Sequence, residues 1–155
     1  EYSQKNRLLD VMEMAKKYYH YVLLNSSQAE AARNYLAERG LTEETILDWQ
    51  IGYSPNGWDS LYNFLRQKNF SDTEIFAAGL VSQKKVGSGF YDRFRARIMF
   101  PISDAGGHVV AFTARVSPEN EATEKMGKYV NSPQTIIYDK GRLLFGLDKA
   151  KSEIK

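Results

Sequence analysis

The stretch "RIMFPISDAGGHVVAFTAR", residues 97–115, decides how the second half of the chain folds. Two runs rich in β-branched and aromatic residues flank "DAGG" at 104–107, and a short glycine-bearing connection between such runs is typical of an antiparallel hairpin. Pro101 has no amide hydrogen to donate to a neighbouring strand, so we expect it at an edge or a bulge. The hairpin predicts that a mostly antiparallel sheet follows Gly79.

The chain before Gly79 has the apolar spacing of helices instead. One helical face begins at Leu8, and its pattern ends at "NSS", residues 25–27. A second helix fits residues 28–39, and Gly40 supplies a left-handed stop. Helices first and strands after them predict an α+β fold, with amino-terminal helices followed by a small, mostly antiparallel sheet.

Side-chain caps mark the shorter helices of this half. Thr42 can cap a third helix, and Ser71 with Glu74 has the spacing of a capping box for a later one. An amphipathic segment that starts near Trp58 and includes Leu65 lies between them. The first half therefore predicts several short helices after one long helix.

The region after the hairpin is less regular. Residues 116–127, "VSPENEATEKMG", are polar and without pattern, so we expect a surface loop there. The runs "TIIY" at 135–138 and "RLLF" at 142–145 indicate further short strands, and a helix is expected from Leu147. We divide the chain into a leading helix and linker at 1–27, one domain at 28–151, and a truncated connection at 152–155.

Composition excludes several classes of protein. The 155 residues include no cysteine, which excludes disulfides and thiolate metal sites and fits a cytoplasmic protein. No apolar run is long enough to cross a bilayer, so we expect no membrane partner. Because the sequence lacks an initiating methionine and ends in a charged run, we expect it to be a piece of a longer protein.

Charge is distributed unevenly along the chain. Residues 1–83 hold 8 Lys and Arg against 11 Asp and Glu, a net −3, whereas residues 84–155 hold 13 against 8, a net +5. A basic second half favours a polyanionic partner. The same gradient also fits a solvated surface, or a protein-interaction module that docks an acidic partner through its basic face.

Signatures of catalysis and of metal binding are missing from the sequence. His20 and His108 have no partner at ligand spacing, and "GSG" at 87–89 fits a turn better than a phosphate-binding loop. The acidic residues of the second half are scattered singly, whereas a two-metal site needs clustered carboxylates. We therefore predict no catalytic residue and no metal ligand in this chain.

Basic residues mixed with aromatics remain as candidates for binding. Arg93, Arg95 and Arg97 are spaced by two, so on one extended strand they would form a row facing phosphates, or a charged edge that prevents aggregation. In "KYVNSPQTIIYDKG", residues 128–141, Lys128 offers a charge and Tyr129 a stacking plane, although Tyr129 could equally be a core aromatic.

Five strings occur in the order and approximate spacing seen in bacterial replicative DNA primase: "YLAERGL", "IGYSPNGWDSL", "AAGLV", "YDRFRARIMFPISDAGGHVVAFTARV" and "KYVNSPQTIIYDKGRLLFGLDKA". The likeness runs from about Ala29 to Lys151. The chain resembles the amino-terminal part of that family's RNA polymerase domain, the catalytic core, upstream of the Toprim domain. Its loop at 117–127 is longer than in many members.

The resemblance implies a function that composition alone does not give. A member of the family is a DNA-directed RNA polymerase, a nucleotidyltransferase that makes short RNA primers on single-stranded DNA during replication. Mg²⁺ or Mn²⁺ on the Toprim domain and Zn²⁺ on a zinc-binding domain are implied for the full-length protein, and this piece alone is expected to be inactive. The implied partners are the template, the RNA–DNA hybrid, ribonucleoside triphosphates and, through another domain, the replicative helicase.

The resemblance also implies which side chains hold nucleic acid. In the family, basic and polar residues line a groove beside the metal site. The residues implied to line this groove here are Arg39, Arg115, Lys128, Tyr129, Asn131 and Lys140, with Arg93, Arg95 and Arg97 as further candidates.

Overall fold

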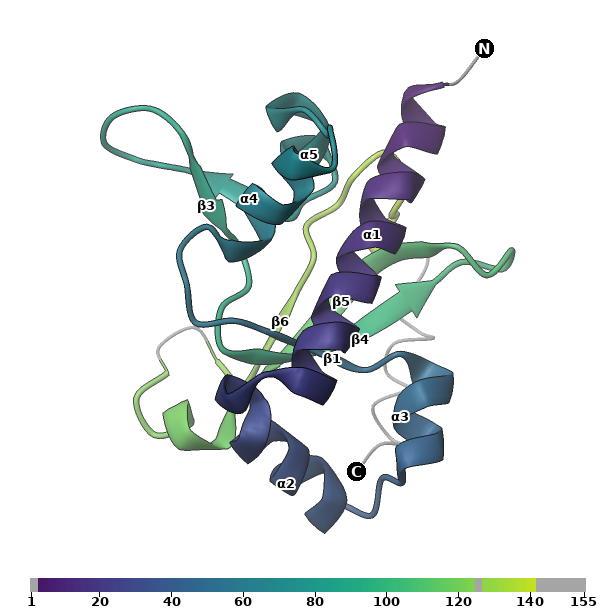
Figure 1. Cartoon of the computed structure of the whole chain (residues 1–155). Helices are drawn as coiled ribbons and strands as arrows, with labels where there is room; N and C mark the ends of the chain where they lie inside the picture. Colours follow the sequence, from purple (N-terminus) through teal and green to yellow (C-terminus); the bar gives the residue numbers. More distant parts are fainter. Residues whose placement is uncertain (1–2, 125–126, 142–155) are drawn as a thin grey trace.

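Helices dominate the first half of the chain and strands the second in the computed structural model, which describes residues 3–124 and 127–141 (Figure 1). One short strand, at Gly52–Ser54, comes earlier, between the third and fourth helices. The predicted α+β fold is confirmed. The helices are α1 (Gln4–Asn25), α2 (Glu30–Glu38), α3 (Glu43–Trp49), α4 (Ser60–Gln67) and α5 (Asp72–Ala77), with 3₁₀ turns η1 (Ser27–Ala29) and η2 (Pro118–Asn120). The strands are β1 (Gly52–Ser54), β2 (Val81–Gln83), β3 (Phe90–Asp92), β4 (Arg97–Ser103), β5 (Val109–Val116) and β6 (Tyr129–Asn131).

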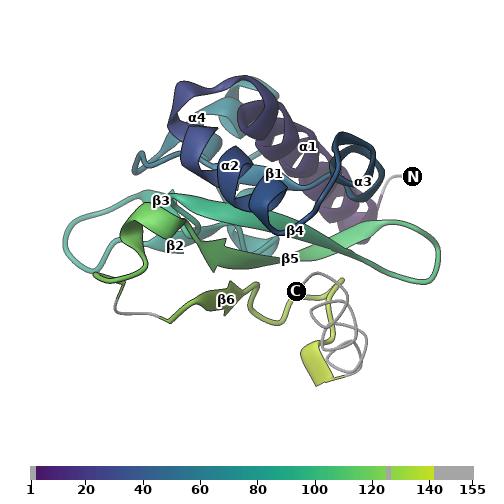
Figure 2. The ribbon, with the colours of Figure 1, turned by 90° about the horizontal axis from the view of Figure 1, so that it is seen from below.

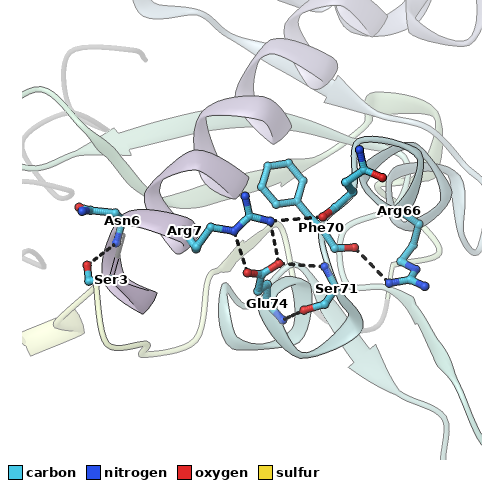
Figure 3. A network of polar contacts seen from close by, with 8 residues as sticks. Ser3, Asn6, Arg7, Arg66, Phe70, Ser71 and Glu74 are labelled. Carbon is cyan, nitrogen blue, oxygen red and sulfur yellow. Dashed lines mark hydrogen bonds and ion pairs between the residues drawn. The ribbon is translucent and has the colours of Figure 1, made fainter. Parts of the chain in front are cut away.

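The helix ends follow the predicted capping signals. The side chain of Thr42 accepts the Thr45 amide at the start of α3, and Ser71 with Glu74 makes both hydrogen bonds of a capping box on α5. Arg7 of α1 donates to both oxygens of the Glu74 carboxylate, at 2.8 and 3.0 Å (Figure 3). The capping box is thereby joined to the first turns of the long helix.

The predicted hairpin is the centre of a four-stranded antiparallel sheet in the order β1-β4-β5-β6 (Figure 2). Asp104 closes the turn, because its carboxylate accepts the amides of Gly106 and His108. Strand β1 pairs only with Arg97–Met99 of β4. Pro101 lies beyond that pairing, so its missing amide hydrogen breaks no ladder in the described residues, as expected of an edge position.

Strand β5 is buried along its whole length, because core residues cover both faces of the sheet. Phe112 and Ala114 pack in one cluster with the middle of α1, α4 and α5. Ile98 and Phe100 of β4 pack in a second cluster with the last turns of α1 and with α2. Burial on both faces explains why apolar residues run without alternation from Val109 to Phe112, whereas Thr113 and Arg115 bring polar groups to one face further along the strand.

Helix α1 crosses β1 at unusually short range, and a glycine makes this possible. A Cβ atom placed on Gly52 would lie 2.5 Å from Tyr19 Cβ and 2.6 Å from the Tyr19 carbonyl carbon. No real side chain tolerates such contacts. The helix can therefore lie directly on the strand only while position 52 has no side chain. In this position, α1 contributes eight buried residues to the fold.

Two predicted strands are not formed, and two further predicted elements lie outside the residues that the structure describes. Residues 93–96 do not extend β4, because Ala96 adopts a φ of +53°, which turns the chain between β3 and β4. The run 135–138 forms a turn with one bridge between Thr135 and Tyr138, not a strand. The expected strand at 142–145 and the helix from Leu147 lie outside the described residues. Within residues 3–124 and 127–141, no helix has both the length and the apolar character needed to span a membrane.

Candidate nucleic-acid interface

A pocket of about 190 Å³ opens where α2 meets the sheet, and four of the predicted site residues line it. Arg39 comes from the end of α2, Arg115 from β5, and Lys128 and Tyr129 from the start of β6. The apolar part of the wall comes from Leu36, Leu41 and Phe100, and Tyr35 completes the lining.

Sheet register explains why residues so far apart in sequence meet here. In the antiparallel pairing of β5 with β6, Arg115 is the partner of Tyr129 and Thr113 the partner of Asn131. Directly paired residues project from the same face of a sheet. Arg115 and Tyr129 therefore face the same pocket, although a loop of more than ten residues separates them in the sequence.

Tyr35 is the aromatic centre of the pocket. Its ring lies 4.4 Å from the guanidinium carbon of Arg115 and 5.0 Å from that of Arg39. Tyr35 and Arg39 are four residues apart on α2, so they share one face of the helix. Two guanidinium groups next to one ring keep positive charge at the pocket while the aromatic surface limits their motion.

The carboxylate of Glu121, which follows η2, neutralises part of this charge. Its Oε1 lies 3.1 Å from Arg115 Nη2, and its Oε2 lies 3.6 Å from Lys128 Nζ. The hydrogen bond from Arg115 and the charge of Lys128 lower the pKa of Glu121, so it is ionised at neutral pH. The pocket is thus basic but already holds one carboxylate.

Arg97 does not face the pocket; it is a buried structural residue. Its guanidinium donates to the carbonyl oxygens of Ala114, Gly127 and Lys128 at 3.2–3.3 Å, and it pairs with Glu124 at 3.1 Å. Burial lowers the pKa of Arg97, an effect that Glu124 opposes. Arg97 therefore fixes the backbone of the segment that carries Lys128.

Arg93 and Arg95 point to separate places, so the predicted arginine row does not form. Arg93 donates to the Gly79 carbonyl at 3.0 Å, and burial lowers its pKa. Arg95 lies over the ring of Trp58 at 4.2 Å, with Tyr91 at 5.4 Å. The turn at Ala96 separates both from Arg97, and a role for any of the three in DNA binding stays a prediction.

Asn131 and Lys140 do not line the pocket. The Asn131 side-chain oxygen accepts a 2.6 Å hydrogen bond from Thr113, while Lys140 is exposed near the end of the described residues. Ser132, which follows in the same motif, is buried and accepts the Phe112 amide at 2.9 Å. This part of the motif therefore serves the fold as well as offering polar groups.

No group of three or more His, Cys, Asp or Glu in the described residues could hold a metal ion. Asp92, one of the singly placed acidic residues, has a structural role. It is buried and accepts the amides of Leu61 and Tyr62 at the start of α4. Burial raises its pKa to about 6, although both hydrogen bonds oppose the rise.

Comparison with known proteins identifies the family. Residues 18–151 match the family model described as the DNA primase catalytic core, N-terminal domain. This chain belongs to that family. The prediction made from the five strings is confirmed.

Individual relatives agree with the family model. A DNA primase of Enterococcus faecalis is 40% identical over 156 residues, covering 100% of this chain and 25% of that protein. The RNA polymerase domain of Mycobacterium tuberculosis primase DnaG superposes with a TM-score of 0.79 at 40% identity, over 86% of this chain and 42% of that one. A DnaG primase catalytic domain bound to single-stranded DNA gives 0.75 at 35% identity, over 90% and 41%.

The chain spans about a quarter of the length of the curated relatives that it matches. Two residues of the site, Tyr35 and Glu121, were not predicted from the sequence. A helical spacing of four from Arg39 could have indicated Tyr35, whereas Glu121 is one of several glutamates in a loop without pattern, so nothing singled it out.

Proposed function

We propose that this domain supplies the template-binding surface of a DNA primase that makes RNA primers on single-stranded DNA during replication. The pocket that gathers Arg39, Arg115, Lys128 and Tyr129 carries the proposal. Arginine and lysine contact phosphates, and an exposed tyrosine offers a plane for a base. The Tyr129 side chain is 40% exposed, which leaves its ring within reach of a strand. A relative of similar fold binds single-stranded DNA.

The contribution of this domain to the reaction is to hold and orient nucleic acid. Divalent ions held by a neighbouring Toprim domain would supply the chemistry. For the full-length protein, this proposal also includes a zinc ion in a separate domain and a cytoplasmic location. Its further partners are ribonucleoside triphosphates, the RNA–DNA hybrid and the replicative helicase. The division into 1–27, 28–151 and 152–155 is proposed in the same sense.

Salt-dependent binding tests the proposal directly. The 155-residue chain is titrated with a fluorescein-labelled single-stranded oligonucleotide at several salt concentrations. With about four to six phosphate contacts, log K falls against log salt with a slope of about −3 to −4, since each contact on a single strand contributes about −0.7. Lys128→Ala, which removes one contact, weakens binding and makes the slope shallower by about 0.7.

A matched lysine controls for net charge. Lys17 of α1 is exposed and does not line the pocket, so Lys17→Ala removes the same charge at an unrelated place. We expect Lys17→Ala to bind like the unchanged protein. Equal, salt-insensitive binding by all three proteins would exclude the pocket as a phosphate-binding surface.

Docking of an acidic protein partner was the other function that the charge gradient allowed. Family membership gives it no support, because the matching strings include the residues that line the pocket.

A further inference from the structure

The carboxylate of Glu121 occupies the place in which the pocket would hold an anion. Its two oxygens face two different cations, Arg115 Nη2 at 3.1 Å and Lys128 Nζ at 3.6 Å. Arginine and lysine contact two oxygens of a phosphate in the same way. A ligand phosphate and Glu121 would therefore compete for the same pair of donors.

The two sides of this contact differ in how far they can move. The Arg115 side chain is only 6% exposed, and it is held by the Val116 carbonyl at 2.8 Å and by the ring of Tyr35. The Glu121 side chain is 38% exposed and lies on the solvent side of the pair. Arg115 is thus the fixed partner, and Glu121 is the group that can leave into water.

We propose that Arg115 and Lys128 form a phosphate-binding subsite and that Glu121 is its intrachain occupant, displaced when a phosphate of single-stranded DNA binds. The inference rests on the proposed function. Its consequence is that the chain reduces its own affinity for nucleic acid, because each binding event must break the contact of Glu121 with both cations. A phosphate that reaches only one of the two donors cannot replace both contacts of Glu121, so it binds less well than a phosphate that contacts both Arg115 and Lys128.

The same loop provides a matched control. Glu124 pairs with Arg97 at 3.1 Å, but Arg97 donates to three backbone carbonyls and does not line the pocket. Glu124→Gln and Glu121→Gln remove one negative charge each from the same segment. Only Glu121→Gln removes a carboxylate from the two donors of the proposed subsite.

Oligonucleotide binding by the two variants tests the inference. Because Glu121→Gln leaves both donors without a carboxylate before DNA binds, one more net positive charge faces the strand and the salt slope becomes steeper by about 0.7. Between 1 M and 0.1 M salt the variant therefore gains about five-fold more affinity than the unchanged protein gains. Glu124→Gln is expected to change binding by less than about two-fold, because Glu124 does not contact the two donors and Arg97 keeps its three carbonyl partners. Glu121→Asp, which keeps the charge on a shorter side chain, should bind with intermediate affinity. Thermal unfolding of each variant confirms that the fold is retained.

The outcomes separate this inference from the proposed function. If Glu121→Gln binds no tighter than the unchanged protein, or if Glu124→Gln tightens binding equally, the inference is wrong, although Lys128→Ala can still weaken binding and support the proposed function. If none of the proteins shows salt-dependent binding, both are wrong.

Discussion

The contact between Arg7 and Glu74 makes the stability of this domain depend on acid pH, and replacing Glu74 by Gln tests that dependence (Figure 3). Hydrogen bonds from Arg7 and from the Ser71 amide lower the pKa of Glu74 from 4.5 to about 2. Such a shift corresponds to about 3 kcal/mol between the ionised and neutral forms. Because the side chains of Arg7 and Glu74 are 35% and 23% exposed, solvent screening reduces this to about 1–2 kcal/mol.

The sign of the pH dependence follows from the direction of the shift. The pKa in the folded state lies below the unfolded value, so the folded state favours the ionised carboxylate. The stabilisation is complete above the ordinary value of 4.5 and is lost as the pH falls through about 2. Gln is the matched replacement, because its amide oxygen can still accept the Ser71 amide and keep the capping box.

Urea unfolding, followed by circular dichroism across this pH range, measures the effect. We expect Glu74→Gln to lower the free energy of unfolding by about 1–2 kcal/mol at neutral pH and to approach the unchanged protein in acid. As a control, Glu13→Gln removes the i,i+3 pair with Lys16, a contact within one helix, and should cost about 0.5 kcal/mol or less. If the difference in free energy of unfolding between Glu74→Gln and the unchanged protein stays constant from neutral to acid pH, the charge of Glu74 is not its source. If the two proteins do not differ at all, the ion pair contributes nothing to stability.

Two further changes test the packing and the buried carboxylate. Gly52→Ala places a Cβ against the Tyr19 backbone and should destabilise the fold by about 3 kcal/mol in urea unfolding. As a control, Gly40→Ala meets nothing within 4 Å and strains only a φ of +85°, so it should cost about 1 kcal/mol. Similar costs for the two variants would contradict the close crossing of α1 and β1. Burial raises the pKa of Asp92 to about 6, so the folded state favours its protonated form and the free energy of unfolding falls as the pH rises from about 4 to 6. Asp92→Asn lacks this fall, so its stability relative to the unchanged protein should rise by about 2 kcal/mol over that range, and parallel pH profiles would refute the assignment.

Much of the fold could be predicted because the signals are local. Capping at Thr42 and Ser71 depends on residues three apart, and the hairpin depends on a short connection between two apolar runs. The turn at Ala96 gave no such signal, because alanine rarely adopts a positive φ and only tertiary contacts impose it. That single residue turned a regular spacing of arginines into three unrelated environments.

The candidate site was predicted from family resemblance more than from physical pattern. Arg39, Arg115, Lys128 and Tyr129 do share a pocket, and sheet register accounts for it. The partner of Arg115 could not be predicted, because any glutamate of the polar loop could in principle reach it. Partner choice in such a loop depends on its path in space, which the sequence pattern does not encode.

The way Lys128 is held has a consequence for the length of the loop before it. The Val116 amide donates to the Lys128 carbonyl at 2.7 Å, and Arg97 holds the carbonyls of Gly127 and Lys128 from a different strand. Both anchors belong to the sheet, so the two ends of the connection stay in place whatever its length. Insertions or deletions between them can therefore tune the acidity next to the pocket without moving the lysine, which makes this connection a natural place to engineer affinity for nucleic acid.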